Sequence, residues 1–228
     1  MQLHIDADIL VYRCGFASQD DPESYALHSL DCMVQDILIE YPEVPYQLYL
    51  TGKGNFRFDI AKTHPYKGTR SKKEKPIHYA AIRQHLIDYW KAEVVEGQEA
   101  DDAIAQGQHA SGYKDVIVTI DKDLNGVPGK HYNFVKRLEY DITAEEATRF
   151  FYSQILTGDT VDNIIGLKGI GPKKAEKILE DCTTEREMYE ACVAAYEKFE
   201  EPDPEARVCE NAQLLYMRVE EDKPWEIP

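Results

Sequence analysis

The stretch LHIDAD, Leu3–Asp8, decides the fold, because a short apolar run ends directly in two acidic residues. The stretch VIVTIDKD, Val116–Asp123, repeats the pattern and also ends in an acidic pair. Apolar runs of this length predict buried strands. In a parallel α/β sheet the carboxyl ends of the strands line the ligand crevice, so we expect the two acidic pairs to lie there.

Strand-like and helical segments alternate over the first 142 residues. Tyr46–Leu50 is a further expected strand and Tyr132–Val135 a weaker one, while residues 27–41, 80–90 and 99–109 have helical patterns. This alternation implies right-handed crossovers and a parallel sheet that is covered on both faces. A capping box formed by Thr143 and Glu146 then starts a helical region in which we expect no strands. We therefore predict an α/β body over residues 1–142 and a helical region over 143–228.

Composition excludes several classes of protein. The chain has 228 residues, is 43% hydrophobic, and has no apolar run near the ~20 residues that span a bilayer, so we expect a globular protein without a membrane partner. Its N-terminus lacks the basic segment of a secretory signal. The five scattered cysteines indicate reduced thiols and a cytoplasmic location.

Net charge is a misleading guide to the partner. The formal charge of −16 argues against nucleic acid, but it is unevenly distributed along the chain. Residues 181–228 contain 14 acids and 5 bases, whereas Lys53–Lys75 contains eight bases and two acids. A basic block inside an acidic chain requires an explanation of its own.

Acidic residues gather in four short motifs, two at expected strand ends and two at helix ends. Single Asp-x-Asp pairs are common in turns and caps, but four clusters together favour a metal site. Carboxylates without cysteine suit a hard cation such as Mg²⁺ or Mn²⁺, and two ions can act together in phosphodiester hydrolysis. The candidate ligands are Asp6, Asp8, Glu99, Asp101, Asp102, Asp121, Asp123, Asp159 and Asp162.

Two basic elements are candidates for binding a phosphate backbone. The first is the loop YKGTRSKKEKP, residues 66–76, in which an aromatic ring is available to stack on a base. The second is the glycine-rich turn GLKGIGPKKA, residues 166–175, where free backbone amides precede a helix that starts at a proline. The expected DNA-binding residues are Tyr66, Lys67, Arg70, Lys72 and Lys73 in the loop, and Lys168, Gly169, Gly171, Lys173 and Lys174 in the turn.

These motifs together resemble the 5′-nuclease (flap endonuclease) family, which includes phage 5′–3′ exonucleases and the 5′-nuclease domains of bacterial DNA polymerases. The matches extend over residues 6 to about 180 in family order: Asp6, YKGTR at 66–70, EADD at 99–102, DKD at 121–123, and GDTVDN at 158–163 before the glycine turn. The resemblance implies a Rossmann-like (PIN/5′-nuclease), mostly parallel sheet. It also implies a helical arch at about 60–80 and a helix–three-turn–helix element at about 158–181.

The resemblance further implies a function. It indicates a two-metal, structure-specific 5′ nuclease that acts on DNA with free 5′ ends, flaps or nicks, as an exonuclease, a flap endonuclease or both. RNA in RNA–DNA hybrids stays open as a further substrate. The implied cofactors are two Mg²⁺ ions, for which Mn²⁺ can substitute, with a K⁺ at the glycine turn, and we expect a monomer.

Carried over residue by residue, the resemblance divides the acids between two ions. Asp6, Glu99, Asp101 and Asp121 match the tight metal site, and Asp123, Asp159 and Asp162 match the second. Lys67 and Arg70 match bases that contact the scissile phosphate, and with Asp6 and Asp121 they are the expected catalytic residues. The family usually has another acid after the second strand, where this chain reads TGKGN at 51–55; Asp8, or less favourably Asp59, is the candidate substitute.

Three alternatives explain fewer of the motifs. A haloacid-dehalogenase-like phosphatase also has Asp-x-Asp after its first strand, but its second motif is one residue longer and it needs neither basic element. A non-catalytic protein that binds DNA structures has no use for so many acids. A PIN-type ribonuclease would share the acids but not the glycine turn.

Overall fold

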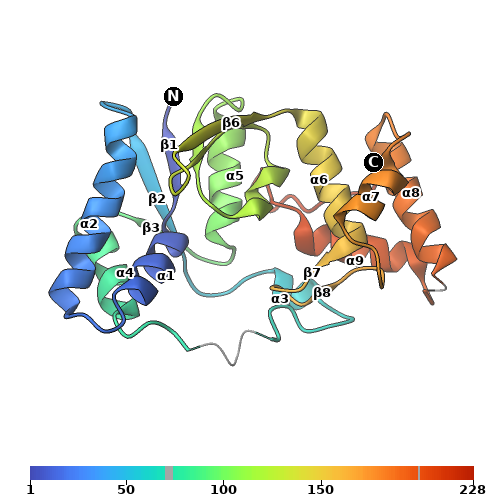
Figure 1. The fold of residues 1–228 in the computed structure, drawn as a ribbon. Helices are drawn as coiled ribbons and strands as arrows, with labels where there is room; N and C mark the ends of the chain where they lie inside the picture. Colours follow the sequence, from blue (N-terminus) through green and yellow to red (C-terminus); the bar gives the residue numbers. More distant parts are fainter. Residues whose placement is uncertain (70–73, 200) are drawn as a thin grey trace. The chain divides into compact units, whose positions relative to one another are not determined.

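The computed structural model describes residues 1–69, 74–199 and 201–228, which form two compact units (Figure 1). The first unit comprises Met1–Gly54 and Glu74–Ile142, and the second comprises Asn55–Lys73 and Thr143–Pro228. The division at residue 142 coincides with the expected boundary. The sequence interpretation assigned residues 60–80 to the α/β body, whereas most of this segment clusters with the second unit.

The first unit is built on a six-stranded sheet with the order β3-β2-β1-β4-β5-β6. The strands are β1 (Leu3–Asp6), β2 (Tyr46–Thr51), β3 (Glu93–Val95), β4 (Val116–Val118), β5 (Gly129–Asn133) and β6 (Leu138–Ile142). All neighbours pair in parallel except β5 and β6, which are antiparallel. Because β2, β1 and β4 are adjacent and parallel, their carboxyl ends lie at one edge, as the fold prediction required.

Alternation along β1 directs its side chains to two different groups of helices. The helices of this unit are α1 (Ala7–Ala17), α2 (Glu23–Glu40), α4 (Tyr79–Asp88) and α5 (Ala100–Ala110), with a 3₁₀ turn η2 (Lys122–Gly126) after β4. Leu3 and Ile5 are fully buried in one apolar core with residues of α1, α2 and α4. The intervening residue His4 instead faces Gly107 of α5. The sheet is therefore covered on both faces, which confirms the expected α/β layering.

Elements that the sequence analysis did not identify are short or follow a strand without a break. β3 has only three residues, and β6 carries an exposed, polar sequence. α1 begins one residue after β1, and Asp6 is both the last strand residue and the helix N-cap, with its side chain accepting from the amide of Ile9. Because one acid both ends the strand and caps the helix, the sequence pattern shows no separate start for α1.

The second unit is mainly helical. It contains α3 (Arg57–Ile60), α6 (Ala144–Thr157), α7 (Pro172–Leu179), α8 (Glu185–Lys198) and α9 (Pro204–Leu215). The predicted capping box of Thr143 and Glu146 is present at the start of α6. Apolar side chains of α6 to α9, among them Leu214 and Leu215, form its core.

Two expectations for this unit need correction. Strands do occur after Thr143, because β7 (Gly158–Asp159) and β8 (Ile164–Ile165) form a small antiparallel ribbon between α6 and α7. Two residues per strand is too short for any apolar pattern to reveal. Between α3 and α4, the described residues 61–69 and 74–78 contain no helix, so the expected helical arch is not found in that part of the segment. Within the described residues, no helix is both long and apolar enough to cross a bilayer.

Gly107 is required by the close approach of α5 to β1. A Cβ at this position would lie 2.4 Å from Cε1 of His4. The imidazole cannot withdraw freely, because Nδ1 is 3.1 Å from the hydroxyl of Tyr49 and Nε2 is 3.1 Å from Oδ2 of Asp115. Gly107→Ala is therefore expected to lower the free energy of unfolding by about 1–3 kcal/mol, measured by urea denaturation.

Gly126→Ala provides the matched control for this prediction. Among the described residues, no heavy atom lies within 4 Å of a Cβ built at Gly126. Equal urea midpoints for Gly107→Ala and Gly126→Ala would contradict the steric account.

Candidate metal centre and nucleic-acid interface

Seven of the nine predicted acids belong to the first unit and follow its strands. Asp6 ends β1 and Asp8 lies in the first turn of α1. Glu99 caps α5, with Asp101 and Asp102 in its first turn, and Asp121 and Asp123 cap and open the 3₁₀ turn after β4. The remaining two, Asp159 and Asp162, belong to the second unit.

Thr119 links the acids of the two central strands. Its hydroxyl donates to Oδ2 of Asp6 at 3.0 Å. The hydroxyl oxygen of Thr119 also accepts from the amide of Asp121 at 3.0 Å. The side chain is almost entirely buried, so these bonds fix both acidic residues relative to β4. The sequence analysis did not single out Thr119. Its position two residues before the strand-end acid is the only signal that could have done so.

Asp8 occupies the place where the second strand lacks an acid. Its Oδ2 accepts from the amide of Thr51, the last residue of β2, at 2.9 Å. Its Oδ1 is 3.3 Å from Nη1 of Arg83, and Nη2 of Arg83 donates to the carbonyl of Thr51. Asp8 therefore supplies a carboxylate to the end of β2 from α1. The other candidate, Asp59, lines a cavity in the second unit instead.

Asp102 has a structural role. Its Oδ2 accepts from the amide of Glu99 at 3.1 Å, which forms the capping box of α5 together with the Glu99 side chain. Its side chain is fully buried at this cap. Asp102 therefore forms part of the cap of α5, and its place among the metal ligands stays a prediction, as it does for the capping residue Glu99.

Burial and mutual repulsion raise the pKa values of the central carboxyls. Burial, followed by the charge of Asp8, raises the pKa of Asp6 to about 7. Burial and the charges of Asp6 and Glu99 raise the pKa of Asp101 well above its usual value. Burial also raises the pKa of Asp8, although the bonds from Thr51 and the charge of Arg83 oppose it. These carboxyls resist being charged together unless protons or a cation enter.

This donor set fits a hard divalent cation, since carboxylate oxygens predominate and no cysteine is among them. As the side chains stand in the described part of the chain, no three His, Cys, Asp or Glu residues converge closely enough to hold an ion. Ion binding would therefore have to draw the carboxylates together. The predicted ligands in the first unit are Asp6, Asp8, Glu99, Asp101, Asp102, Asp121 and Asp123.

In the second unit, the acidic turn after β7 contacts the basic loop. Oδ2 of Asp162 accepts from the hydroxyl of Tyr66 at 2.7 Å and is 3.8 Å from Nζ of Lys67. The amide of Lys67 also donates to the carbonyl of Asp162 at 2.8 Å. Asp159 accepts from the amide of Val161 at 2.7 Å. The predicted second-site acid Asp162 and the predicted catalytic Lys67 are therefore direct neighbours.

Tyr66 is not available to stack on a base, and that prediction is wrong. Only 4% of the residue is exposed, because its ring packs in the core of the second unit, edge-on to Phe58 with ring centroids 5.6 Å apart. An aromatic residue beside lysines has the same sequence signature whether its ring is buried or exposed. The predicted contacts of Arg70, Lys72 and Lys73 lie outside the described residues.

The glycine turn leads into α7 as expected. Gly169 has a φ of 76°, which favours glycine, and Gly171 is the N-cap that precedes Pro172, without a side-chain cap. Lys168, Lys173 and Lys174 are exposed, which suits contact with a phosphate backbone. Nζ of Lys174 donates to the carbonyl of Gly169 at 2.8 Å, so this lysine also stabilises the turn.

Comparison with known proteins shows similarity to DNA polymerase I and to a 5′–3′ exonuclease. No protein-family model matches it. It is 35% identical over 112 residues to DNA polymerase I of Deinococcus radiodurans, covering 43% of this chain and 11% of that one. It is 30% identical over 135 residues to a 5′–3′ exonuclease of Aquifex aeolicus, covering 54% of this chain and 45% of that one. The chain thus spans a minor part of these relatives.

A solved structure extends the likeness to nearly the whole chain. The flap endonuclease D15 of bacteriophage T5, in a complex with DNA and metal ions, matches with a TM-score of 0.68 and 18% identity, over 95% of this chain and 89% of that one. The fold is that of the 5′ nucleases. The matches confirm the resemblance to this family that the motifs indicated.

Removing one of the repelling carboxylates should stabilise the metal-free first unit. Asp101→Asn is expected to raise the free energy of unfolding in EDTA, since it removes the carboxyl whose pKa burial and the neighbouring acids raise. The stabilisation that Mg²⁺ gives the wild-type protein should shrink in the variant. Thermal unfolding with EDTA and with Mg²⁺ measures both effects.

Asp21→Asn is the control for this measurement, because Asp21 is exposed and lies in the same unit. A loss of stability in Asp101→Asn under EDTA would contradict the proposed repulsion.

Proposed function

We propose that the chain is a metal-dependent, structure-specific 5′ nuclease that hydrolyses phosphodiesters near the 5′ ends of DNA. The observation that carries the proposal is the link from Asp6 through Thr119 to Asp121 at the edge where β1 and β4 end. It holds acids from two distant segments together although burial and their charges oppose this. The relatives named as a 5′–3′ exonuclease and a flap endonuclease support the same activity.

The acids and bases have separate roles in this proposal. Divalent ions held by the acids of the first unit, and by Asp159 and Asp162, would offset negative charge on the phosphate during hydrolysis and activate water. Thr119 keeps Asp6 and Asp121 in place. Lys67, with Arg70, binds the phosphate that reacts, and the lysines of the glycine turn bind the duplex backbone without reading sequence.

The finer parts of the proposal concern ions, substrates and location. We propose Mg²⁺ as the natural ion, with Mn²⁺ as a substitute, because the donors are carboxylates. A K⁺ bound by backbone carbonyls of the glycine turn would compete with Lys174 for the carbonyl of Gly169. DNA flaps, nicks and free 5′ ends are the proposed substrates, and RNA–DNA hybrids are a further substrate to be tested. We also propose a monomer in a reducing cytoplasm, in keeping with five free cysteines.

The phosphatase alternative fits the geometry less well. Such an enzyme would use the first strand-end aspartate as a nucleophile. Both oxygens of Asp6 accept hydrogen bonds, Oδ1 from the amide of Ile9 at 3.3 Å and Oδ2 from Thr119 at 3.0 Å. The residue is also buried. These contacts suit a fixed ligand better than an attacking group.

Digestion of 5′-labelled DNA tests the function. Flap and nicked DNA should be cut near the 5′ end with Mg²⁺ or Mn²⁺, cleavage should stop with EDTA, and p-nitrophenyl phosphate should not be hydrolysed. Asp121→Asn should abolish cleavage while DNA binding stays equal or tightens, because repulsion of phosphate is removed. Full cleavage in chelator, or release of p-nitrophenol without cleavage of DNA, would contradict the proposal.

The two basic elements should differ in their kinetic effects. An interaction made mainly in the transition state lowers the rate at saturation, whereas uniform binding changes affinity. Lys67→Ala is therefore expected to slow single-turnover cleavage far more than it weakens DNA binding. The double variant Lys173→Ala/Lys174→Ala should weaken duplex binding and reduce the log–log salt slope by about one unit per lost phosphate contact. Its cleavage rate at saturating protein should stay near wild type.

The same two measurements on both variants decide between catalysis and docking. If Lys67→Ala changes only affinity, the basic loop is a second docking surface and its catalytic role is wrong.

A further inference from the structure

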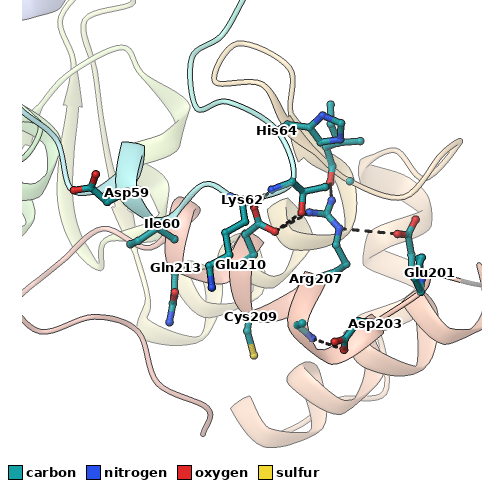
Figure 2. Close-up of a pocket in the computed structure, with 15 residues that line it drawn as sticks. Asp59, Ile60, Lys62, His64, Glu201, Asp203, Arg207, Cys209, Glu210 and Gln213 are labelled. Atoms are coloured by element: carbon teal, nitrogen blue, oxygen red, sulfur yellow. Dashed lines mark hydrogen bonds and ion pairs between the residues drawn. The ribbon is translucent and has the colours of Figure 1, made fainter.

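The basic loop is joined to α3 by a short segment, residues 62–64, that borders a cavity. The cavity has a volume of about 880 Å³ and lies within the second unit (Figure 2). Its lining includes Lys62, Thr63 and His64 on one side and residues of α9 on another. We call residues 62–64 the strap. Because the strap faces a cavity, packing alone does not fix its position.

One carboxylate on α9 holds the strap. Oε1 of Glu210 accepts from the amides of Lys62 at 2.7 Å and Thr63 at 2.8 Å. Its Oε2 accepts from the hydroxyl of Thr63. Among the described residues, no other hydrogen bond involves the strap. Glu210 is therefore its polar anchor.

Glu210 is itself held in place and kept charged. Nη1 of Arg207 lies 3.1 Å from its Oε2, and Nη2 of Arg207 donates to the carbonyl of Ile165 at 3.2 Å. Burial opposes ionisation, but the bonds from Thr63 and Lys62 and the charge of Arg207 outweigh it and lower the pKa of Glu210. Hydrogen bonds to an ionised acceptor are roughly twice as strong as neutral ones.

The strap leads directly to Lys67 through a second attachment. The carbonyl of Pro65 accepts from Nδ2 of Asn163 at 2.9 Å, and Tyr66 and Lys67 bind Asp162. The backbone of residues 62–67 is therefore held by Glu210 at its start and by the turn of Asp162 and Asn163 at its end. Thr63 lies only four residues before Lys67, so the strap and the Asp162 turn together set the course of the backbone at the lysine.

We propose that Glu210 is a positioning residue, which fixes the strap and thereby presents Lys67 to the reacting phosphate. This inference rests on the proposed nuclease function. Glu210 does not touch the substrate in this account and acts only through Lys67. Misplacement of a reacting group by about 1 Å can cost on the order of 100-fold in rate, so the anchor matters even though it is remote from the chemistry.

Glu210→Gln tests the role with little change in shape. The amide side chain keeps one acceptor oxygen and presents donors to a strap that also donates. We expect single-turnover cleavage at saturating DNA to slow by about 10- to 100-fold, while the Kd for duplex DNA stays within about twofold. Hydrogen exchange at the amides of Lys62 and Thr63 should accelerate, because their acceptor is weakened.

The control and a second background separate positioning from general destabilisation. Glu197→Gln, an exposed change of the same kind on α8, should alter neither the cleavage rate nor these two amides. In a Lys67→Ala background, Glu210→Gln should cause little additional loss, since both changes remove the same presentation of Lys67. If Glu210→Gln fails to fold, Thr63→Val removes the hydroxyl bond from the strap side and should give a smaller loss of the same kind.

The outcomes distinguish this inference from the function on which it rests. If the wild-type protein does not cleave DNA, the proposed function fails. If the wild type cleaves and Glu210→Gln cleaves equally fast, or loses as much rate in the Lys67→Ala background as alone, the positioning role of Glu210 is wrong. Unchanged hydrogen exchange at Lys62 and Thr63 would also overturn it.

Discussion

The repulsion between the carboxylates at the end of β1 and in the first turn of α5 is the constraint around which the first unit is organised. Burial and neighbouring acids raise the pKa values of Asp6 and Asp101, so holding the two carboxylates near one another costs free energy. The fold meets this cost with neutral donors. The hydroxyl of Thr119 donates to Asp6 and accepts from the amide of Asp121. Backbone amides at the helix starts donate to Asp6 and Asp102. A site that is strained without a cation is well prepared to bind one.

The two units divide the proposed work between them. The first unit carries seven of the nine predicted acidic ligands, which follow strands of its mostly parallel sheet. The second unit carries the glycine turn, the lysines around it and the segment that leads to Lys67. In that unit, Glu210 of α9 binds the strap, and Asp162 in the turn between β7 and β8 binds the start of the basic loop. In the proposed function, the second unit therefore contributes Lys67, Asp159 and Asp162 to the chemistry as well as the lysines that bind the duplex.

Much of this plan could be predicted from the sequence, because its signals are local. The acids that end β1 and follow β4, the capping box at Thr143 and the glycine turn before Pro172 are each visible within about ten residues. The missed features depend on contacts between residues far apart in sequence. Thr119 reaches Asp6, Arg83 reaches Asp8, and Glu210 reaches the strap. Tyr66 was misjudged for the same reason, since its burial depends on Phe58 and on a turn almost 100 residues later.

The central claim is that acids from separate segments of the first unit form one cation site, in which Asp8 replaces the acid missing after β2. The most direct test is a Mn²⁺ titration in which electron paramagnetic resonance counts the free ion for the wild type, Asp8→Asn and Asp59→Asn. Loss of a ligand or of its support typically costs 10- to 100-fold in metal affinity, so Asp8→Asn should weaken Mn²⁺ binding by about that factor. Asp59→Asn, in the cavity of the second unit, should bind Mn²⁺ like the wild type. Equal affinity for Mn²⁺ in all three proteins would contradict the account.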